Sequence, residues 1–210
     1  MTGDAVLTLA PEVASIVRPA SMVLASLTVS DDTLGLAEAL GQAAERGRTG
    51  SVAAEVTAAV RSMYKAVGLD PTKVRPSSEA LLRRVRRGEP LPRINTAVDV
   101  VNWCSMESQL PFGLYDADRI QGVPVLRLGR DGEAYPGIRK DAIHVAGRLT
   151  VADDAGPFGN PTSDSARTMV TAATTRVLVV IYAPVAVAAA LVDGALAATR
   201  ERLLRYCGRR

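Results

Sequence analysis

Three polar side chains recur at helical spacing within an otherwise apolar stretch of the sequence. Asn95, Asp99 and Asn102 stand at positions i, i+4 and i+7, so a helix over about residues 95–108 presents them on one face. Such a face meets solvent, forms buried hydrogen bonds or lines a binding site. For Asp99 we expect a structural role as a buried hydrogen-bonding group.

A second polar segment, residues 152–165, crowds small, turn-forming and hydroxyl residues between two predicted strands. Its sequence is ADDAGPFGNPTSDS. Carboxylates, amides and hydroxyls gathered in this way can bind a polar substrate, and the same composition also favours a rigid turn. Both interpretations stay open on composition alone.

Arginine outnumbers lysine by 22 to three and gathers in two places. One cluster ends a predicted helix over residues 77–88, with Arg75 and Arg93 beside it, and the other occupies the C-terminal residues from Arg200 onward. Such clusters can bind phosphates, and they also offset the dipole at a helix C-terminus. The net charge of +3 is too small to indicate a polyanionic partner by itself. The first cluster comprises Arg83, Arg84, Arg86 and Arg87.

Motifs of the common enzyme classes are absent from the sequence. It contains no GxGxxG, P-loop, HExxH or GxSxG pattern, which argues against dinucleotide, nucleotide, zinc-peptidase and α/β-hydrolase chemistry. The one histidine, His144, is predicted to be a structural residue on a strand, and Cys104 is predicted to be a core thiol. Because metal-ligand spacing is also absent, we expect neither a metal nor a cofactor.

The 210 residues are 48% apolar and 22% charged, as is typical of a globular protein. Cys104 and Cys207 form no CxxC pair, which fits a reducing compartment. The N-terminus lacks the features of a secretory signal, and the longest apolar run, residues 177–192, is short and interrupted by Pro184. The sequence therefore predicts a cytoplasmic protein that does not enter a membrane.

Hydrophobic periodicity places most helices before the strands. A final helix is expected from Pro184 to about residue 206. This order predicts an α+β fold, a single compact domain with a mixed β-sheet covered by helices, rather than a doubly wound sheet. The other predicted helices are 34–46, 51–67 with Ser51 as N-cap, 77–88 and 95–108, and the predicted strands are 22–29, 123–128, 144–152 and 168–182.

The residues around the first polar segment follow the order of a known family pattern. The matching positions are Asn95, Val98, Asp99, Asn102, Glu107, Pro111 and Asp116, with Met106 one place late. This segment resembles the B3/B4 editing domain of the phenylalanyl-tRNA synthetase β subunit, and residues 156–165 and 181–184 resemble its small freestanding relatives. The resemblance is strongest over residues 77–184. It implies one B3/B4-like domain over residues 1–210, with residues 1–70 packed onto the matching part and residues 184–206 as its C-terminal helix.

The resemblance implies a freestanding deacylase that acts in trans and hydrolyses the ester of a mischarged tRNA. Asn102 matches the family's pocket asparagine and is expected to orient substrate or water, with Asn160 and Asp164 as the other catalytic candidates. The expected tRNA contacts are Arg83, Arg84, Arg86 and Arg87. The expected substrate-binding residues are Arg93, Asn95, Gly113, Ser163 and Ser165.

Two departures from the family pattern keep other functions open. Gly113 occupies the position of the family's histidine, and the glutamate that contacts the side chain of the wrong amino acid in the synthetase is replaced near Val180. The family's selectivity for tyrosine is therefore not expected of this chain. An activated aminoacyl ester can still be hydrolysed by a pocket of amides and hydroxyls. The alternative is a non-catalytic module that binds a tRNA acceptor end or a free amino acid, and a third possibility is an accessory protein that acts only when bound to a synthetase.

Overall fold

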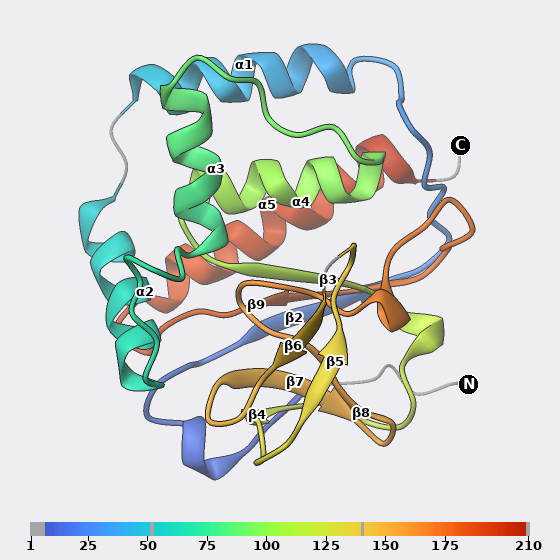
Figure 1. Ribbon diagram of the computed structural model, residues 1–210. Coiled ribbons are helices and arrows are strands. Elements are labelled where there is room, and N and C mark those ends of the chain that lie inside the picture. The colour runs from blue at the N-terminus through green and yellow to red at the C-terminus, as the bar shows by residue number, and fades with distance from the viewer. Residues whose placement is uncertain (1–6, 51–52, 140, 209–210) are drawn as a thin grey trace.

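The fold is built around strand β9 (Val177–Ile181), whose residues VLVVI are all buried. In the computed structural model, which describes residues 7–50, 53–139 and 141–208, β9 pairs antiparallel with β2 (Ala20–Leu24) and β3 (Phe112–Asp116). A strand that is apolar at every position fits a sheet covered on both faces. Figure 1 shows this central sheet crossing the middle of the molecule.

Helices cover one face of the central sheet. α4 packs against β3, α5 packs against β2, and α1 and α3 contact α4 from above (Figure 1). The seam between α4 and α5 is closed by Arg202, whose guanidinium carbon lies 3.9 Å from the centre of the Trp103 ring. The helices are α1 (Leu36–Thr49), α2 (Ala54–Ala66), α3 (Ser77–Arg86), α4 (Thr96–Ser108) and α5 (Ala189–Cys207).

A four-stranded sheet in the order β1-β4-β7-β8 covers the other face, with the β5–β6 hairpin beside it (Figure 1). β1 runs parallel to β4, whereas the remaining pairs are antiparallel. The two layers meet where Tyr115 of β3 packs edge-on against Phe158 of β8, with ring centres 4.9 Å apart. These strands are β1 (Thr8–Leu9), β4 (Val125–Leu128), β5 (Ala134–Pro136), β6 (Ala142–His144), β7 (Leu149–Asp153) and β8 (Gly156–Gly159), and short 3₁₀ turns are η1 (Pro11–Val13), η2 (Ala117–Arg119) and η3 (Ala166–Thr168).

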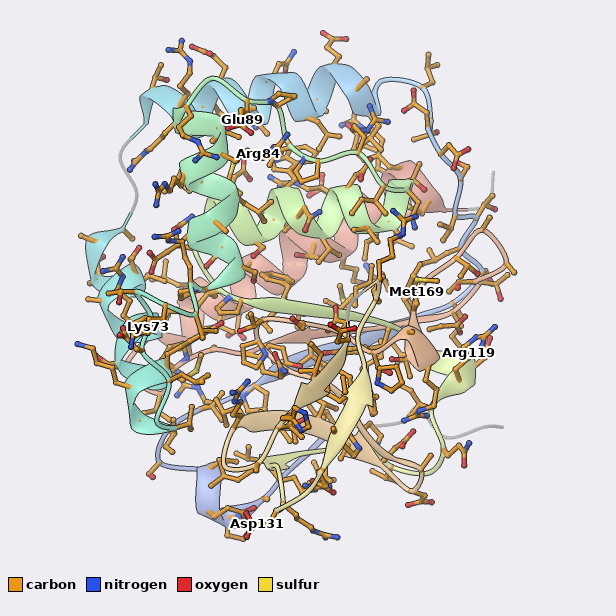
Figure 2. The ribbon with its side chains drawn as sticks, in the orientation of Figure 1. Lys73, Arg84, Glu89, Arg119, Asp131 and Met169 are labelled. Atoms are coloured by element: carbon orange, nitrogen blue, oxygen red, sulfur yellow. The ribbon has the colours of Figure 1, made fainter. Side chains whose placement is uncertain are left out.

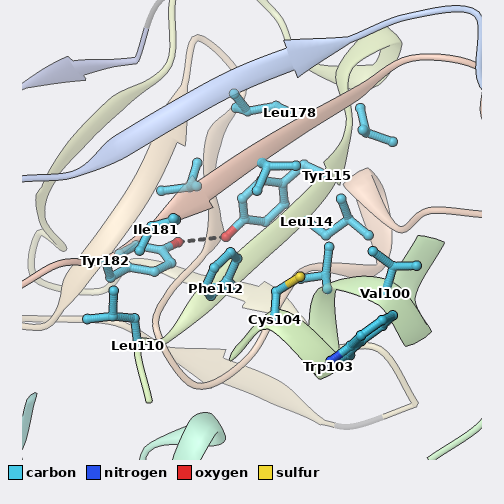
Figure 3. Close-up of a cluster of buried hydrophobic side chains, with 14 of the residues drawn as sticks. Val100, Trp103, Cys104, Leu110, Phe112, Leu114, Tyr115, Leu178, Ile181 and Tyr182 are labelled. Atoms are coloured by element: carbon cyan, nitrogen blue, oxygen red, sulfur yellow. Dashed lines mark hydrogen bonds between the residues drawn. The ribbon is translucent and has the colours of Figure 1, made fainter. Parts of the chain in front are cut away.

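A pair of tyrosines forms a polar centre in the core. The hydroxyl oxygens of Tyr115 and Tyr182 lie 2.6 Å apart, and Figure 3 shows the pair among apolar neighbours such as Phe112 and Ile181. Burial raises the pKa of both phenols well above the ordinary value. Both phenols therefore stay protonated at neutral pH, and each hydroxyl is satisfied by the other.

The structure confirms the α+β class and places α1 to α4 close to the helices predicted from periodicity. The predicted N-cap Ser51 lies outside the described residues, and α2 begins at Ala54. The start of the last helix at Pro184 is wrong. Pro184 instead forms a β-bridge with Val17 and begins a turn, in which its carbonyl accepts the Val187 N–H at 3.0 Å, and α5 begins only at Ala189.

The strands differ more from the sequence prediction than the helices do. They are divided among three sheets, and the predicted strand 144–152 is split because a glycine turn separates β6 from β7. Only residues 177–181 of the predicted strand 168–182 are extended in a sheet. The N-terminal strands pair with β4 and β9, so they share sheets with strands from the later part of the chain.

Candidate functional site

A cleft lies where α4, β3 and the loop after β8 meet. It consists of two adjoining cavities of about 240 and 370 Å³. We call the smaller cavity the polar half, because it adds Ser77, Ser105, Asn160, Thr162 and Ser163, and the larger cavity the apolar half. The residues that line both halves are Val101, Asn102, Phe112, Ile138 and Asp164.

Asn102 stands at the junction of the two halves. It is half-buried on α4, between Val101 and Trp103, which are buried in the core and fix the helix in place. Within the described parts of the chain, no group forms a hydrogen bond with the Asn102 side-chain amide. The amide therefore presents two donor hydrogens and an acceptor oxygen to whatever enters the cleft.

The loop opposite Asn102 is held in one shape by its own hydrogen bonds. The Asn160 side-chain oxygen accepts the backbone N–H groups of Thr162 and Ser163, at 2.8 and 2.9 Å. Its Nδ2 donates to the Tyr135 hydroxyl at 2.8 Å, and that hydroxyl donates to the Ser163 carbonyl at 2.5 Å. Tyr64 adds a bond from its hydroxyl to the Pro161 carbonyl, at 3.0 Å. Asn160, predicted to be catalytic, lines the cleft but uses its amide to position the loop.

Asp164 brings negative charge to the cleft, which it lines in both halves. Burial, and after it the charge of the Asp164 carboxylate, raises the pKa of Tyr135 and Tyr182. The same two causes act on Tyr115. The negative charge of the carboxylate thus disfavours ionisation of the neighbouring phenols. The same charge could pair with a cationic group of a ligand in the cleft.

The other two members of the predicted polar stripe have structural roles. Asn95 is the N-cap of α4, and its side chain accepts the Val98 backbone N–H at 3.0 Å. Asp99 is fully buried and accepts Arg93 Nε at 2.7 Å and the Ile94 backbone N–H at 2.8 Å. The buried hydrogen-bonding role predicted for Asp99 is confirmed.

Four residues expected to bind substrate are therefore placed outside the cleft lining. Besides Asn95, Arg93 is occupied by ion pairs with Asp99 and Asp32. Ser165 is buried and caps η3 by accepting the Arg167 backbone N–H at 3.1 Å. The fourth, Gly113, is a buried β3 residue, and a Cβ atom at this position would overlap the Tyr115 hydroxyl. Of the five expected substrate contacts, only Ser163 lines the cleft.

The predicted arginine cluster divides into two parts. Arg84 turns toward the end of α3, where it pairs with Glu89 at 3.1 Å and donates to the Pro90 carbonyl at 2.6 Å (Figure 2). The others line a groove of about 430 Å³ between α2 and α3. Arg61 and Arg75 complete this basic groove, and Glu79 beside them pairs with Arg61. The groove residues from the predicted cluster are Arg83, Arg86 and Arg87.

Sequence reasoning missed the residues that reach the site only through the fold. Ile138 comes from the β5–β6 hairpin and Ser77 from the first turn of α3. Arg61 lies on α2, apart from the clustered arginines. No spacing in the sequence joins these segments, although the Pro-Gly pair at residues 136–137 is an ordinary signal for a turn.

Two classes of site are not found in the described part of the chain. No group of three histidine, cysteine, aspartate or glutamate side chains is arranged to hold a metal ion among the described residues. No helix in those ranges is long and apolar enough to cross a membrane. Both cysteines are buried and unpaired, and His144 is exposed on β6.

Comparison with known proteins identifies the family. The sequence profile of the B3/4 domain matches residues 59–198. The chain belongs to the B3/4 domain family. The phenylalanine–tRNA ligase β subunit of Cutibacterium acnes is 32% identical over 132 residues, which make up 61% of this chain and 16% of that subunit. A crystal structure of an N-terminal fragment of the phenylalanyl-tRNA synthetase β-subunit from Pyrococcus horikoshii aligns at 15% identity and a TM-score of 0.43, over 50% of this chain and 39% of that one.

The cleft belongs to the matched part of this B3/4 domain. Its residues from Ser77 to Asp164 all fall within residues 59–198. The N-terminal strands and α1 precede the match. The resemblance to the synthetase β subunit, expected from the sequence, is thereby confirmed.

Proposed function

We propose that this B3/4 domain is a freestanding deacylase that hydrolyses the ester bond of mischarged aminoacyl-tRNA. The observation that carries the proposal is the unengaged amide of Asn102, which faces the Asp164 loop across the cleft. The relation to the phenylalanine–tRNA ligase β subunit supports a substrate connected with tRNA. Because charged tRNA is made in the cytoplasm, we propose that the protein acts there.

The two halves of the cleft match the groups that surround an aminoacyl ester. In the proposed arrangement the substrate's ammonium group faces the Asp164 carboxylate, and its ester carbonyl accepts a hydrogen bond from Asn102 Nδ2. Water adds to the carbonyl carbon, and negative charge develops on the carbonyl oxygen, where the Asn102 amide stabilises it. The bond from that carbon to the ribose oxygen then breaks, and the ribose oxygen takes the proton that the attacking water gives up, relayed by the neighbouring ribose hydroxyl.

The rigidity of the loop supports this proposal. Hydrogen-bond donors accelerate a reaction most when they do not reorganise as charge develops, and one such donor contributes about 10²- to 10³-fold. Asn160, Tyr135 and Tyr64 fix the loop before any ligand binds. Asn160 is thus proposed as a positioning residue, and Asn102 as the residue that contacts the reacting atoms.

The basic groove is proposed to dock the tRNA backbone. Ser77 lines the cleft and Glu79 lines the groove, two residues further along the first turn of α3. An RNA strand whose charged end occupies the cleft therefore has arginines beside its phosphates as it leaves. Arg83 is exposed in this groove, and Arg87 follows one turn later as the C-cap residue of α3, where it also pairs with Glu89 at 2.8 Å.

A second candidate is a module that binds the charged end of tRNA without hydrolysis. One observation favours it: no histidine lines the cleft among the described residues, since His144 lies exposed on β6. General acid–base catalysis by such a group contributes about 10²- to 10⁴-fold in enzymes that use it. Turnover separates the two candidates.

The test is incubation of the purified chain with correctly and wrongly charged tRNAs, followed by release of the amino acid. The deacylase proposal expects faster release than in buffer from at least one mischarged tRNA and no loss from the correctly charged partner. Asn102→Ala serves as the matched variant. A full panel without release, together with measurable tRNA binding, would establish the binding module instead.

A further inference from the structure

Two walls of the apolar half of the cleft are formed by apolar side chains. Val98 and Val101 of α4 form one wall, and Phe112 and Leu114 of β3 form another. Val101, Phe112 and Leu114 are each less than a tenth exposed. The remaining space of about 370 Å³ is large enough for a bulky side chain.

The mouth of this half is also apolar. Ile94 and Met169 line it and are 60% and 36% exposed, although large apolar side chains are otherwise mostly buried here. Met169 lies beside η3, where Figure 2 labels it. A single exposed apolar side chain needs no explanation, but two that face an apolar cavity would be covered by a ligand occupying it.

Polar groups meet the apolar half only at its edges. Among the described residues that line it, the polar side chains are Asn102, Arg139 and Asp164. Asn102 and Asp164 are shared with the polar half, and Arg139 is exposed. A ligand that spans the cleft therefore meets hydrogen-bonding groups at one end and hydrocarbon at the other.

We infer that the apolar half is the specificity pocket, and that the substrate is an amino acid ester with a large apolar side chain. The inference rests on the proposed function, because it assigns the polar half to the ester and the ammonium group. A charged side chain packed against these apolar walls would lose much of its hydration, because the charged side chains among the described lining residues, Arg139 and Asp164, stand at the edges of the pocket. A side chain as small as a methyl group would leave most of the cavity unfilled, and in apolar pockets each missing methylene lowers kcat/KM by roughly 10- to 200-fold.

The inference is tested by binding, so that it does not depend on turnover. The probes are 3′-deoxyadenosines that carry leucine, phenylalanine, alanine or aspartate through an amide in place of the ester, and titration calorimetry measures their affinity for the full chain. The leucyl and phenylalanyl probes are expected to bind at least tenfold more tightly than the alanyl probe. The aspartyl probe is expected to bind most weakly.

Two variants probe the pocket wall and its mouth. Val98→Phe fills the apolar half and should lower affinity for the phenylalanyl probe at least tenfold, while leaving the alanyl probe nearly unchanged. Ile94→Asn should weaken both large probes. The matched control is Val123→Asn, because Val123 is 58% exposed and lies outside the cleft lining.

Three results would overturn the inference. The first is equal affinity for all four probes, or no affinity for any of them. The second is a preference for the aspartyl probe. The third is an order of affinities that Val98→Phe does not change. Each of these leaves the deacylase proposal to be decided separately by release of amino acid from charged tRNA. Failure of that release, with the apolar preference intact, would refute hydrolysis and leave the specificity pocket in place.

Discussion

We expect two substitutions on α4 to have opposite effects, although the residues stand only three positions apart. Asn102→Ala should slow catalysis at nearly unchanged stability, whereas Asp99→Ala should lower stability at nearly unchanged catalysis. The Asn102 amide is half-buried and has no hydrogen-bond partner among the described residues. Its removal should therefore change the free energy of unfolding by no more than about 0.5 kcal/mol. If that amide stabilises the developing oxyanion, deacylation should slow by about 10²- to 10³-fold.

The opposite result is expected for Asp99→Ala. The variant loses the charged acceptor of the Ile94 N–H, worth about 1.5–3 kcal/mol, and a pair with the 39%-exposed Arg93, worth about 0.2–1 kcal/mol. A loss of about 2–4 kcal/mol lowers the Tm of a protein of this size by about 4–16 °C. Below the transition, the rate of deacylation should stay within a few-fold of the wild type.

The assay measures amino acid release at a temperature where both variants are folded, together with thermal unfolding by circular dichroism. Asn102→Asp is a useful companion, because it keeps the shape of the side chain while replacing the donor by a carboxylate. Its activity should be as low as that of the alanine variant. If Asn102→Ala instead unfolds early while Asp99→Ala loses turnover at full stability, the assignment of the two side chains is refuted.

Four further variants test the groove, the core and the loop. Arg83→Gln combined with Arg87→Gln should lower tRNA affinity and reduce the slope of log affinity against log salt concentration by roughly one to two units. Arg84→Gln should leave that slope nearly unchanged. Equal slopes in the wild type, the double variant and Arg84→Gln would exclude the groove as a tRNA-binding site. Gly113→His should lower Tm, because its Cβ atom would overlap the buried phenol of Tyr115 and overpacking costs about 1–3 kcal/mol. An unchanged Tm would show that β3 shifts to accommodate the side chain at no cost in stability. Tyr135→Phe removes two hydrogen bonds that hold the Asp164 loop, so hydrogen exchange of the backbone amides should speed up over residues 160–165. The kcat of deacylation should fall about tenfold. Unaltered amide exchange in this segment would contradict the role of Tyr135 in positioning the loop.

Helical periodicity predicted the elements that carry the site better than it predicted the strands. α4 lies within a residue of its expected bounds because an apolar stretch with a capping asparagine leaves few alternatives. β8 was expected as part of a turn, because the sequence GPFG contains residues that disfavour strands. Its pairing with β7 comes from the tertiary contact of Phe158 with Tyr115, which no local pattern encodes.

The candidate site was predictable only in part, for a related reason. Periodicity selected the stripe that contains Asn102 but could not show that Asn95 caps the helix or that Asp99 binds Arg93. Those bonds form with neighbouring backbone and with a residue that precedes the helix. Ile138 reaches the cleft through the hairpin between β5 and β6, and its contribution depends on the packing of layers far apart in the chain.

The ring of Tyr115 joins the two layers in a way that bears on how this protein could evolve. Gly113 faces one edge of the ring through Cε2, and Gly159, the residue before the Asn160 loop, faces the other edge through Cε1; neither leaves room for a Cβ atom. The three positions are therefore epistatic. A side chain gained at position 113 costs stability while the tyrosine is present, and costs less once position 115 carries a smaller residue. A side chain at position 113 and the ring of Tyr115 thus compete for the same space in the core.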